Sequence, residues 1–162
     1  MNSKRLLYSS LLILLTLWLG WTALVDFVVV PGVFRNINDF FEAGDLGIYL
    51  FQRLNSLEVV IASTVVAVVS FIFRSNRRAL PLLISSLVVM IIAFTYFTWL
   101  TPKLSDLTEL WKMSEAGKTI AIADIQQEHQ YFHRIYVIMD TVKLLVLLFM
   151  IVGAVGKEKW TA

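Results

Sequence analysis

Four long apolar segments constrain this chain more than any other feature. Residues 6–25 and 79–102 contain no charged residue, and residues 59–73 and 144–156 are charge-free parts of two further segments. A hydrocarbon core of about 30 Å requires roughly 20 apolar residues in a helix. Because backbone groups in lipid must bond within their own segment, we expect an all-α integral membrane four-helix bundle.

Composition supports one membrane domain covering residues 1–162. Hydrophobic residues make up 58% of the chain and charged residues only 16%, more apolar surface than a soluble domain of this size could bury. The predicted helices cover about 6–30, 46–73, 79–101 and 129–156. The first is too long for a typical signal core and no small-residue cleavage site follows it, so we expect a retained helix.

The basic residues predict the orientation of the bundle. Lys4 and Arg5 precede the first segment, Lys157 and Lys159 follow the last, and three arginines lie in the 74–78 turn. The other two connections are rich in Asp and Glu. Since Lys and Arg are retained on the cytoplasmic side, both termini should be cytoplasmic and the two longer loops outside.

The two outer loops carry patterns that predict short helices. Residues 36–45 contain aromatic residues suited to an interfacial helix. Ser105 is a plausible N-cap for a second helix, which Gly117 would end. A further helical stretch is expected to start near Thr119 and continue into the last segment.

A polar stripe opens the last segment. His129, His133, Tyr136, Asp140 and Lys143 follow one another at spacings of four, three, four and three. On an α-helix they fall within an arc of about 80°. Charged groups at membrane depth are costly and commonly mark function, so the stripe indicates where the chemistry lies.

The other predicted helices also place polar residues in their outer halves. These residues are Thr22, Asp26, Asn55, Glu58, Thr95, Tyr96 and Thr98. If the helices form one bundle, these groups can converge in a pocket open to the outside. Buried ions should pair: Asp140 can bond to Lys143, Glu58 to His133 or Lys143, and Asp26 to Tyr136 or Arg134. Tryptophans such as Trp18 are expected to be packing or interface anchors.

Several functions fit this constellation. The leading hypothesis is a metal ion or metal-containing cofactor, a transition metal or haem, held by His129, His133, Glu58 and Asp26. Asn55, Tyr136, Asp140 and Lys143 would form the polar network around it. The alternatives are an accessory subunit of a larger respiratory or transport complex, a proton-coupled small-molecule transporter, and a structural network that locks the helices together.

Some activities are disfavoured. The net charge of +2 is too small to suggest nucleic acid as a partner, and the absence of cysteine excludes disulfides and thiolate metal sites. No glycine-rich phosphate loop, nucleophile elbow or zincin motif is present, so whether the protein is an enzyme stays undecided. The expected partners are the lipid bilayer and either a second copy of the chain or a larger membrane complex.

Two stretches resemble a known family. One leads from Gly20 through Pro31-Gly32-Val33-Phe34-Arg35 to Leu50-Phe51 and Glu58; the other is Phe132-His133-Arg134-Ile135-Tyr136, followed by Asp140. They resemble an uncharacterised bacterial family, labelled a domain of unknown function, that groups with eukaryotic transmembrane protein 205. His133 matches the family's histidine, whereas Tyr136 and Asp140 replace a small hydroxyl residue and an asparagine.

A more distant likeness is to copper-resistance D membrane proteins and to the haem-binding oxidases of porphyrin synthesis. The helix 1 histidine of those proteins has no counterpart here. Together these resemblances imply a four-helix protein of the bacterial inner membrane, and they favour a metal or haem ligand.

Overall fold

The computed structural model describes residues 3–115, 117 and 122–158 of the chain. Every regular element in these ranges is helical. The elements are α1 (Ser3–Leu24), η1 (Val25–Val29), α2 (Val30–Asn36), α3 (Phe40–Ser75), η2 (Arg77–Ala79), α4 (Leu80–Thr95), η3 (Tyr96–Leu100), α5 (Thr101–Glu115) and α6 (Ile122–Glu158). They join into four rods, each long and apolar enough to cross a membrane. The predicted four-helix bundle is confirmed at this level.

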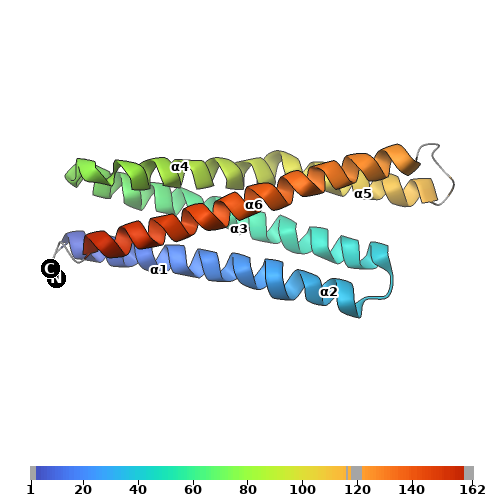
Figure 1. Cartoon of the computed structure of the whole chain (residues 1–162), viewed down its shortest axis with the longest axis horizontal. Helices are drawn as coiled ribbons and strands as arrows, with labels where there is room; N and C mark the ends of the chain where they lie inside the picture. The colour runs from blue at the N-terminus through green and yellow to red at the C-terminus, as the bar shows by residue number, and fades with distance from the viewer. Residues whose placement is uncertain (1–2, 116, 118–121, 159–162) are drawn as a thin grey trace.

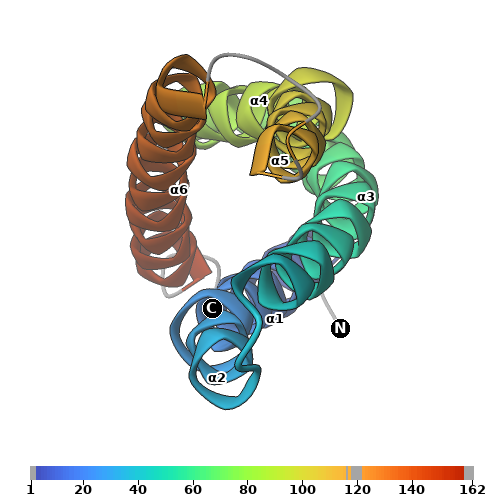
Figure 2. The ribbon, with the colours of Figure 1, turned by 90° about the vertical axis from the view of Figure 1, so that its right-hand side faces the viewer.

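The four rods lie side by side and alternate in chain direction (Figure 1). The α1–α2 rod and the α4–α5 rod each pack against both α3 and α6. Viewed end on, α3 and α6 therefore face each other across the bundle (Figure 2). The start of α1 and the end of α6 lie at the same end as the α3–α4 turn. We call this the basic end, because Arg74, Arg77 and Arg78 lie there, and we call the opposite end the loop end.

The rods are longer than a membrane requires. The four candidate spans have 32, 36, 39 and 34 residues. At 1.5 Å per residue these helices are about 48 to 59 Å long, against a hydrocarbon core of about 30 Å. The separate short helices expected in the outer loops are not seen in the described residues, because α3 already starts at Phe40 and α5 continues the third rod. The helical start expected near Thr119 lies outside the described residues.

The α1–α2 rod and the α4–α5 rod each contain one π-helical turn followed by a proline. In η1 the Val30 N–H donates to the Val25 carbonyl, and in η3 the Thr101 N–H donates to the Tyr96 carbonyl, both five residues back. Proline follows immediately, at positions 31 and 102. Proline lacks an N–H and clashes with the carbonyl four residues earlier. The widened turn accommodates that clash, so both helices continue past the residues where the sequence predicted they would end.

Polar side chains close the short connections. Asp39 caps α3 by accepting hydrogen bonds from the backbone N–H groups of Phe41 and Glu42, at 2.8 and 2.9 Å. Asn76 accepts from the Arg78 N–H at 3.1 Å in the turn between α3 and α4. Such caps satisfy donors that a helix start leaves unpaired.

The interior is divided into two apolar clusters. The larger lies in the half nearer the basic end and includes Leu11, Leu15, Val65, Val69, Leu147 and Met150. The smaller lies nearer the loop end and consists of Ile92, Tyr96, Leu100 and Tyr136 with their partly buried neighbours. Along α3 and α6, the residues between these clusters are polar: Asn55 and Glu58 on one helix, Asp140 and Lys143 on the other. A layer of charge therefore separates the two apolar cores.

Candidate functional site

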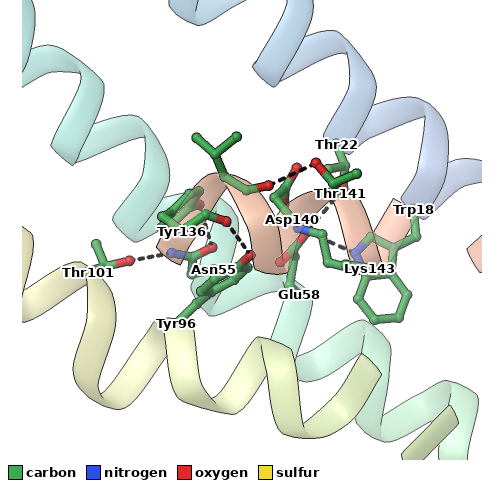
Figure 3. A network of polar contacts seen from close by, with 11 residues as sticks. Trp18, Thr22, Asn55, Glu58, Tyr96, Thr101, Tyr136, Asp140, Thr141 and Lys143 are labelled. Carbon is green, nitrogen blue, oxygen red and sulfur yellow. Dashed lines mark hydrogen bonds and ion pairs between the residues drawn. The ribbon is translucent and has the colours of Figure 1, made fainter. Parts of the chain in front are cut away.

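The centre of this layer is an ion pair across the bundle. Lys143 of α6 donates from Nζ to Oε1 of Glu58 on α3 at 2.8 Å, and the same Nζ lies 2.6 Å from Oδ1 of Asp140 (Figure 3). The ammonium also lies 5.2 Å from the centre of the Tyr96 ring, within range of a cation–π attraction. Lys143 and Glu58 are completely buried. The pair thus joins the two helices that do not pack directly against each other.

One oxygen of Glu58, Oε1, accepts all the hydrogen bonds that the described residues donate to this side chain. Besides Lys143, Oε1 accepts from Nε1 of Trp18 at 2.9 Å and from Oγ1 of Thr22 at 3.0 Å. Trp18 and Thr22 are one turn apart on α1, so the carboxylate connects three rods. The second oxygen, Oε2, is buried and has no hydrogen-bond donor among the described residues. Glu58 therefore keeps acceptor capacity in a place that solvent does not reach.

Asp26 brings a third carboxyl group to the layer. It lies in the π-helical turn η1 and is partly buried. Its side chain lies near Asp140 of α6. Its Oδ2 atom has no hydrogen-bond donor among the described residues. Asp26 thus adds a third carboxyl group near the two that contact the Lys143 ammonium.

A neutral polar network continues towards the loop end. Asn55 donates from Nδ2 to Oγ1 of Thr101 at 2.7 Å, and Tyr136 donates from Oη to Oδ1 of Asn55 at 3.5 Å. Tyr96 donates to the backbone carbonyl of Tyr136 at 3.1 Å, and the two rings stack at 4.4 Å. These residues come from α3, η3, α5 and α6 (Figure 3). The network therefore forms only when these helices are packed together.

The network reaches the surface at a cavity. Between α3 and the η3–α5 segment lies a cavity of about 400 Å³. Its buried lining residues are Asn55 and Thr101, and its exposed lining residues include Arg53, Gln52 and Phe97. Hydrogen-bonding groups therefore extend from the cavity, through Asn55 and Tyr136, towards the charged layer.

Both widened turns supply residues to this site. Asp26 belongs to η1, and Tyr96 belongs to η3. A π-helical turn adds a residue to one turn of helix and rotates the side chains that follow, which is why such turns are frequent at functional sites. In this protein two facing rods carry one each, and both contribute to the same charged layer.

The structure brings together most of the predicted site residues. Asp26, Asn55, Glu58, Tyr136, Asp140 and Lys143 all lie in the charged layer or its polar extension. The contact between Asp140 and Lys143 expected from their spacing is present. Of the two partners considered for Glu58, Lys143 makes the bond. Asp26 lies next to Asp140 and is not bonded to Tyr136 or Arg134, the partners that the sequence suggested.

The two histidines lie elsewhere. His129 and His133 are ten or more residues from Lys143 on α6, which places them about 15 Å or more along the helix axis towards the loop end. Their rings are parallel with centroids 6.3 Å apart, and His129 packs edge-on against Trp111. His133 is exposed. The histidines thus belong to an aromatic cluster near the loop end and take no part in the charged layer.

The predicted metal ligands do not form one metal centre. No group of three or more His, Cys, Asp or Glu side chains in the described part of the chain is arranged to hold a metal ion. Near Glu58 the cation is already present as the Lys143 ammonium. His129 and His133 therefore do not share one metal ion with Glu58 and Asp26.

Two residues of the site were missed or misjudged from sequence. Trp18 was expected to be a packing or interface anchor, yet its indole N–H bonds to Glu58. Thr101 was taken as the end of a helix, but it is the partner of Asn55. The spacing of Trp18, Thr22 and Asp26 at four-residue intervals is the signal that could have indicated a polar face on α1. Thr95 and Thr98, in contrast, bond back to their own helix and lie outside the site.

Residues 13–111 match a family described only as a domain of unknown function, DUF4149. This stretch covers more than half of the chain, so the chain belongs to that family, in agreement with the expected uncharacterised membrane family. No curated protein and no solved structure matches the chain. The likeness to transmembrane protein 205 and to copper-resistance D proteins stays an expectation.

Proposed function

We propose, for a family to which no function is attached, that this protein binds and releases protons at the Glu58–Lys143 site as part of a proton-coupled transport step. The observation that carries the proposal is the excess of carboxyl groups over cations. Glu58 and Asp140 contact one ammonium, that of Lys143, and Asp26 lies near them. One lysine neutralises one carboxylate, and the remaining negative charge needs protons or another cation to be tolerated away from water.

The unpaired oxygens support this proposal. Oε2 of Glu58 and Oδ2 of Asp26 are buried acceptors without donors in the described residues. The hydroxyls of Tyr8 and Ser114 are also buried without a partner among the described residues, but they are neutral groups. The oxygens of Glu58 and Asp26 belong to carboxyl groups, which can take up a proton where no donor is present. Intramembrane carboxyl groups in such settings commonly relay protons.

The polar extension offers a route for proton exchange. Asn55 lies three residues before Glu58 on α3, and Tyr136 lies four residues before Asp140 on α6, so the polar extension reaches from the cavity to within about one helical turn of the charged layer. Hydroxyl groups such as those of Tyr136 and Thr101 both donate and accept, which chains of proton transfer require. Four spans are few for a carrier, so we expect the protein to work as a homo-oligomer or in a larger membrane complex. The accessory-subunit alternative stays a prediction that gentle extraction and mass measurement would test.

Infrared difference spectroscopy tests the proposal without knowledge of any substrate. The purified protein in lipid is titrated with acid and base while the C=O stretch of protonated carboxyl groups is recorded. We expect a pH-dependent carboxyl band that is altered in Glu58→Gln, in Asp140→Asn or in Asp26→Asn. Glu42→Gln is the matched control, because Glu42 is exposed near the start of α3. If none of the three layer variants changes the titration of the folded protein, the site does not exchange protons and the proposal fails.

A further inference from the structure

The cavity between α3 and the η3–α5 segment carries a cation at its rim that the proposed proton route does not use. Arg53 and Gln52 lie at its exposed rim, and Asn55 and Thr101 form its buried floor. The Asn55 side chain is completely buried and Thr101 is 4% exposed. The cavity therefore combines a cation at the mouth with hydrogen-bonding groups at the base.

Arg53 has the freedom to bind an anion. Its guanidinium carbon lies 5.2 Å from the centre of the Tyr49 ring, and no Asp or Glu in the described residues forms a salt bridge with it. Stacking on an aromatic ring leaves the edge of the guanidinium available for hydrogen bonds. Arginine presents these donors as a planar fork that matches carboxylate and phosphate groups.

The position of Arg53 along α3 places this cavity at the membrane boundary. Arg53 precedes Arg74, at the basic end of the same helix, by 21 residues. At 1.5 Å per residue the two arginines are about 31 Å apart, the thickness of one hydrocarbon core. When Arg74 lies at one headgroup layer, Arg53 lies at the other. The cavity thus opens where lipid headgroups meet acyl chains.

The η3 side of the cavity is apolar. Phe97 lines it and is 47% exposed. One helical turn towards the basic end, Phe94 is 53% exposed and faces outward on the same rod. An occupant with an anionic head and a hydrocarbon tail would place its head at Arg53 and its tail along these rings.

From this arrangement we infer that the cavity binds the anionic group, a phosphate or a carboxylate, of a membrane amphiphile. Arg53 holds the charge, Gln52 and the Thr101 hydroxyl supply neutral hydrogen bonds, and Phe97 contacts the tail. The inference shares Thr101 with the proposed proton route, but Arg53, Gln52 and Phe97 belong to the cavity alone. The two proposals can fail separately.

Native mass spectrometry of the detergent-purified protein tests the inference. Phosphatidylglycerol, oleate, phosphatidylcholine and inorganic phosphate are each added in a titration. We expect phosphatidylglycerol or oleate to bind more tightly than phosphatidylcholine, and Arg53→Gln to weaken that binding about tenfold, the size of one charge-assisted hydrogen bond. Arg134→Gln is the matched control, since Arg134 is an exposed arginine of α6 outside the cavity.

The ligand preferences and the effects of the two variants each support or overturn one part of the inference. Preference for phosphatidylglycerol identifies a phosphate headgroup, and preference for oleate identifies a carboxylate. Binding of inorganic phosphate alone would overturn the assignment to an amphiphile. Equal weakening by Arg53→Gln and Arg134→Gln would show general attraction to a basic surface and overturn the site itself. Because Arg53 is exposed, its replacement should leave the fold intact, and circular dichroism of the variant verifies this.

Discussion

Replacing Lys143 with methionine tests how strongly the charged layer depends on its single cation. Methionine keeps most of the volume of the lysine stem but removes the ammonium. Glu58 then loses one of three donors to Oε1, and Asp140 loses its ion-pair partner at 2.6 Å. Two carboxyl groups in the interior are left without their cation. Breaking a buried ion pair in this way costs about 3–5 kcal/mol.

The free energy of unfolding can be measured by adding denaturing detergent to protein in mixed micelles and following helix content and tryptophan fluorescence. Lys103→Met is the matched control, because Lys103 pairs with Glu128 at 2.9 Å while the two side chains are 36% and 47% exposed. An exposed pair of this kind contributes about 1 kcal/mol or less. We expect Lys143→Met to lose several times more stability than Lys103→Met.

A double-mutant cycle separates the pair from its surroundings. Glu58→Met and Lys143→Met each remove the same bond, so their combined effect should be smaller than the sum by at least about 1 kcal/mol. Equal losses for Lys143→Met and Lys103→Met, or strict additivity with Glu58→Met, would refute the claim that this buried pair connects α3 and α6. Circular dichroism of each variant before unfolding shows whether it starts from the same helical state.

Three further predictions concern a hydrogen bond, a close helix contact and the orientation in the membrane. Trp18→Phe should lose about 1.5–3 kcal/mol of unfolding free energy, because it removes a hydrogen bond to a buried carboxylate. The control Trp99→Phe, at a half-exposed position, should change the unfolding free energy by less than about 0.5 kcal/mol. Similar losses for the two variants would contradict the role of the Trp18 indole. Gly153→Val should cost about 1–3 kcal/mol, since even a Cβ there would lie 3.3 Å from a leucine of α4, whereas Gly156→Val has open space and should be tolerated in the same unfolding assay. Ser75→Cys, in a chain that otherwise lacks cysteine, should react with an impermeant thiol reagent only after the cells are opened; labelling of intact cells would reverse the proposed orientation.

The sequence alone was sufficient for features that depend on local spacing or on composition. The charge-free segments predicted four membrane helices, because lipid leaves the backbone no other way to satisfy its hydrogen bonds. The spacing of Asp140 and Lys143 predicted their contact, because residues three apart on a helix are neighbours wherever that helix packs.

Only the tertiary structure decided how residues on different helices meet. Lys143 rather than His133 reaches Glu58, because the rotation and offset of α6 against α3 depend on packing along the whole bundle. The sequence likewise did not determine whether the helices end at Pro31 and Pro102 or continue past them. A proline in an apolar segment can end a helix or follow a widened turn, and contacts with neighbouring rods decide which of the two occurs. Spacing along one helix thus determines which residues share a face, while the packing of the bundle determines what that face meets.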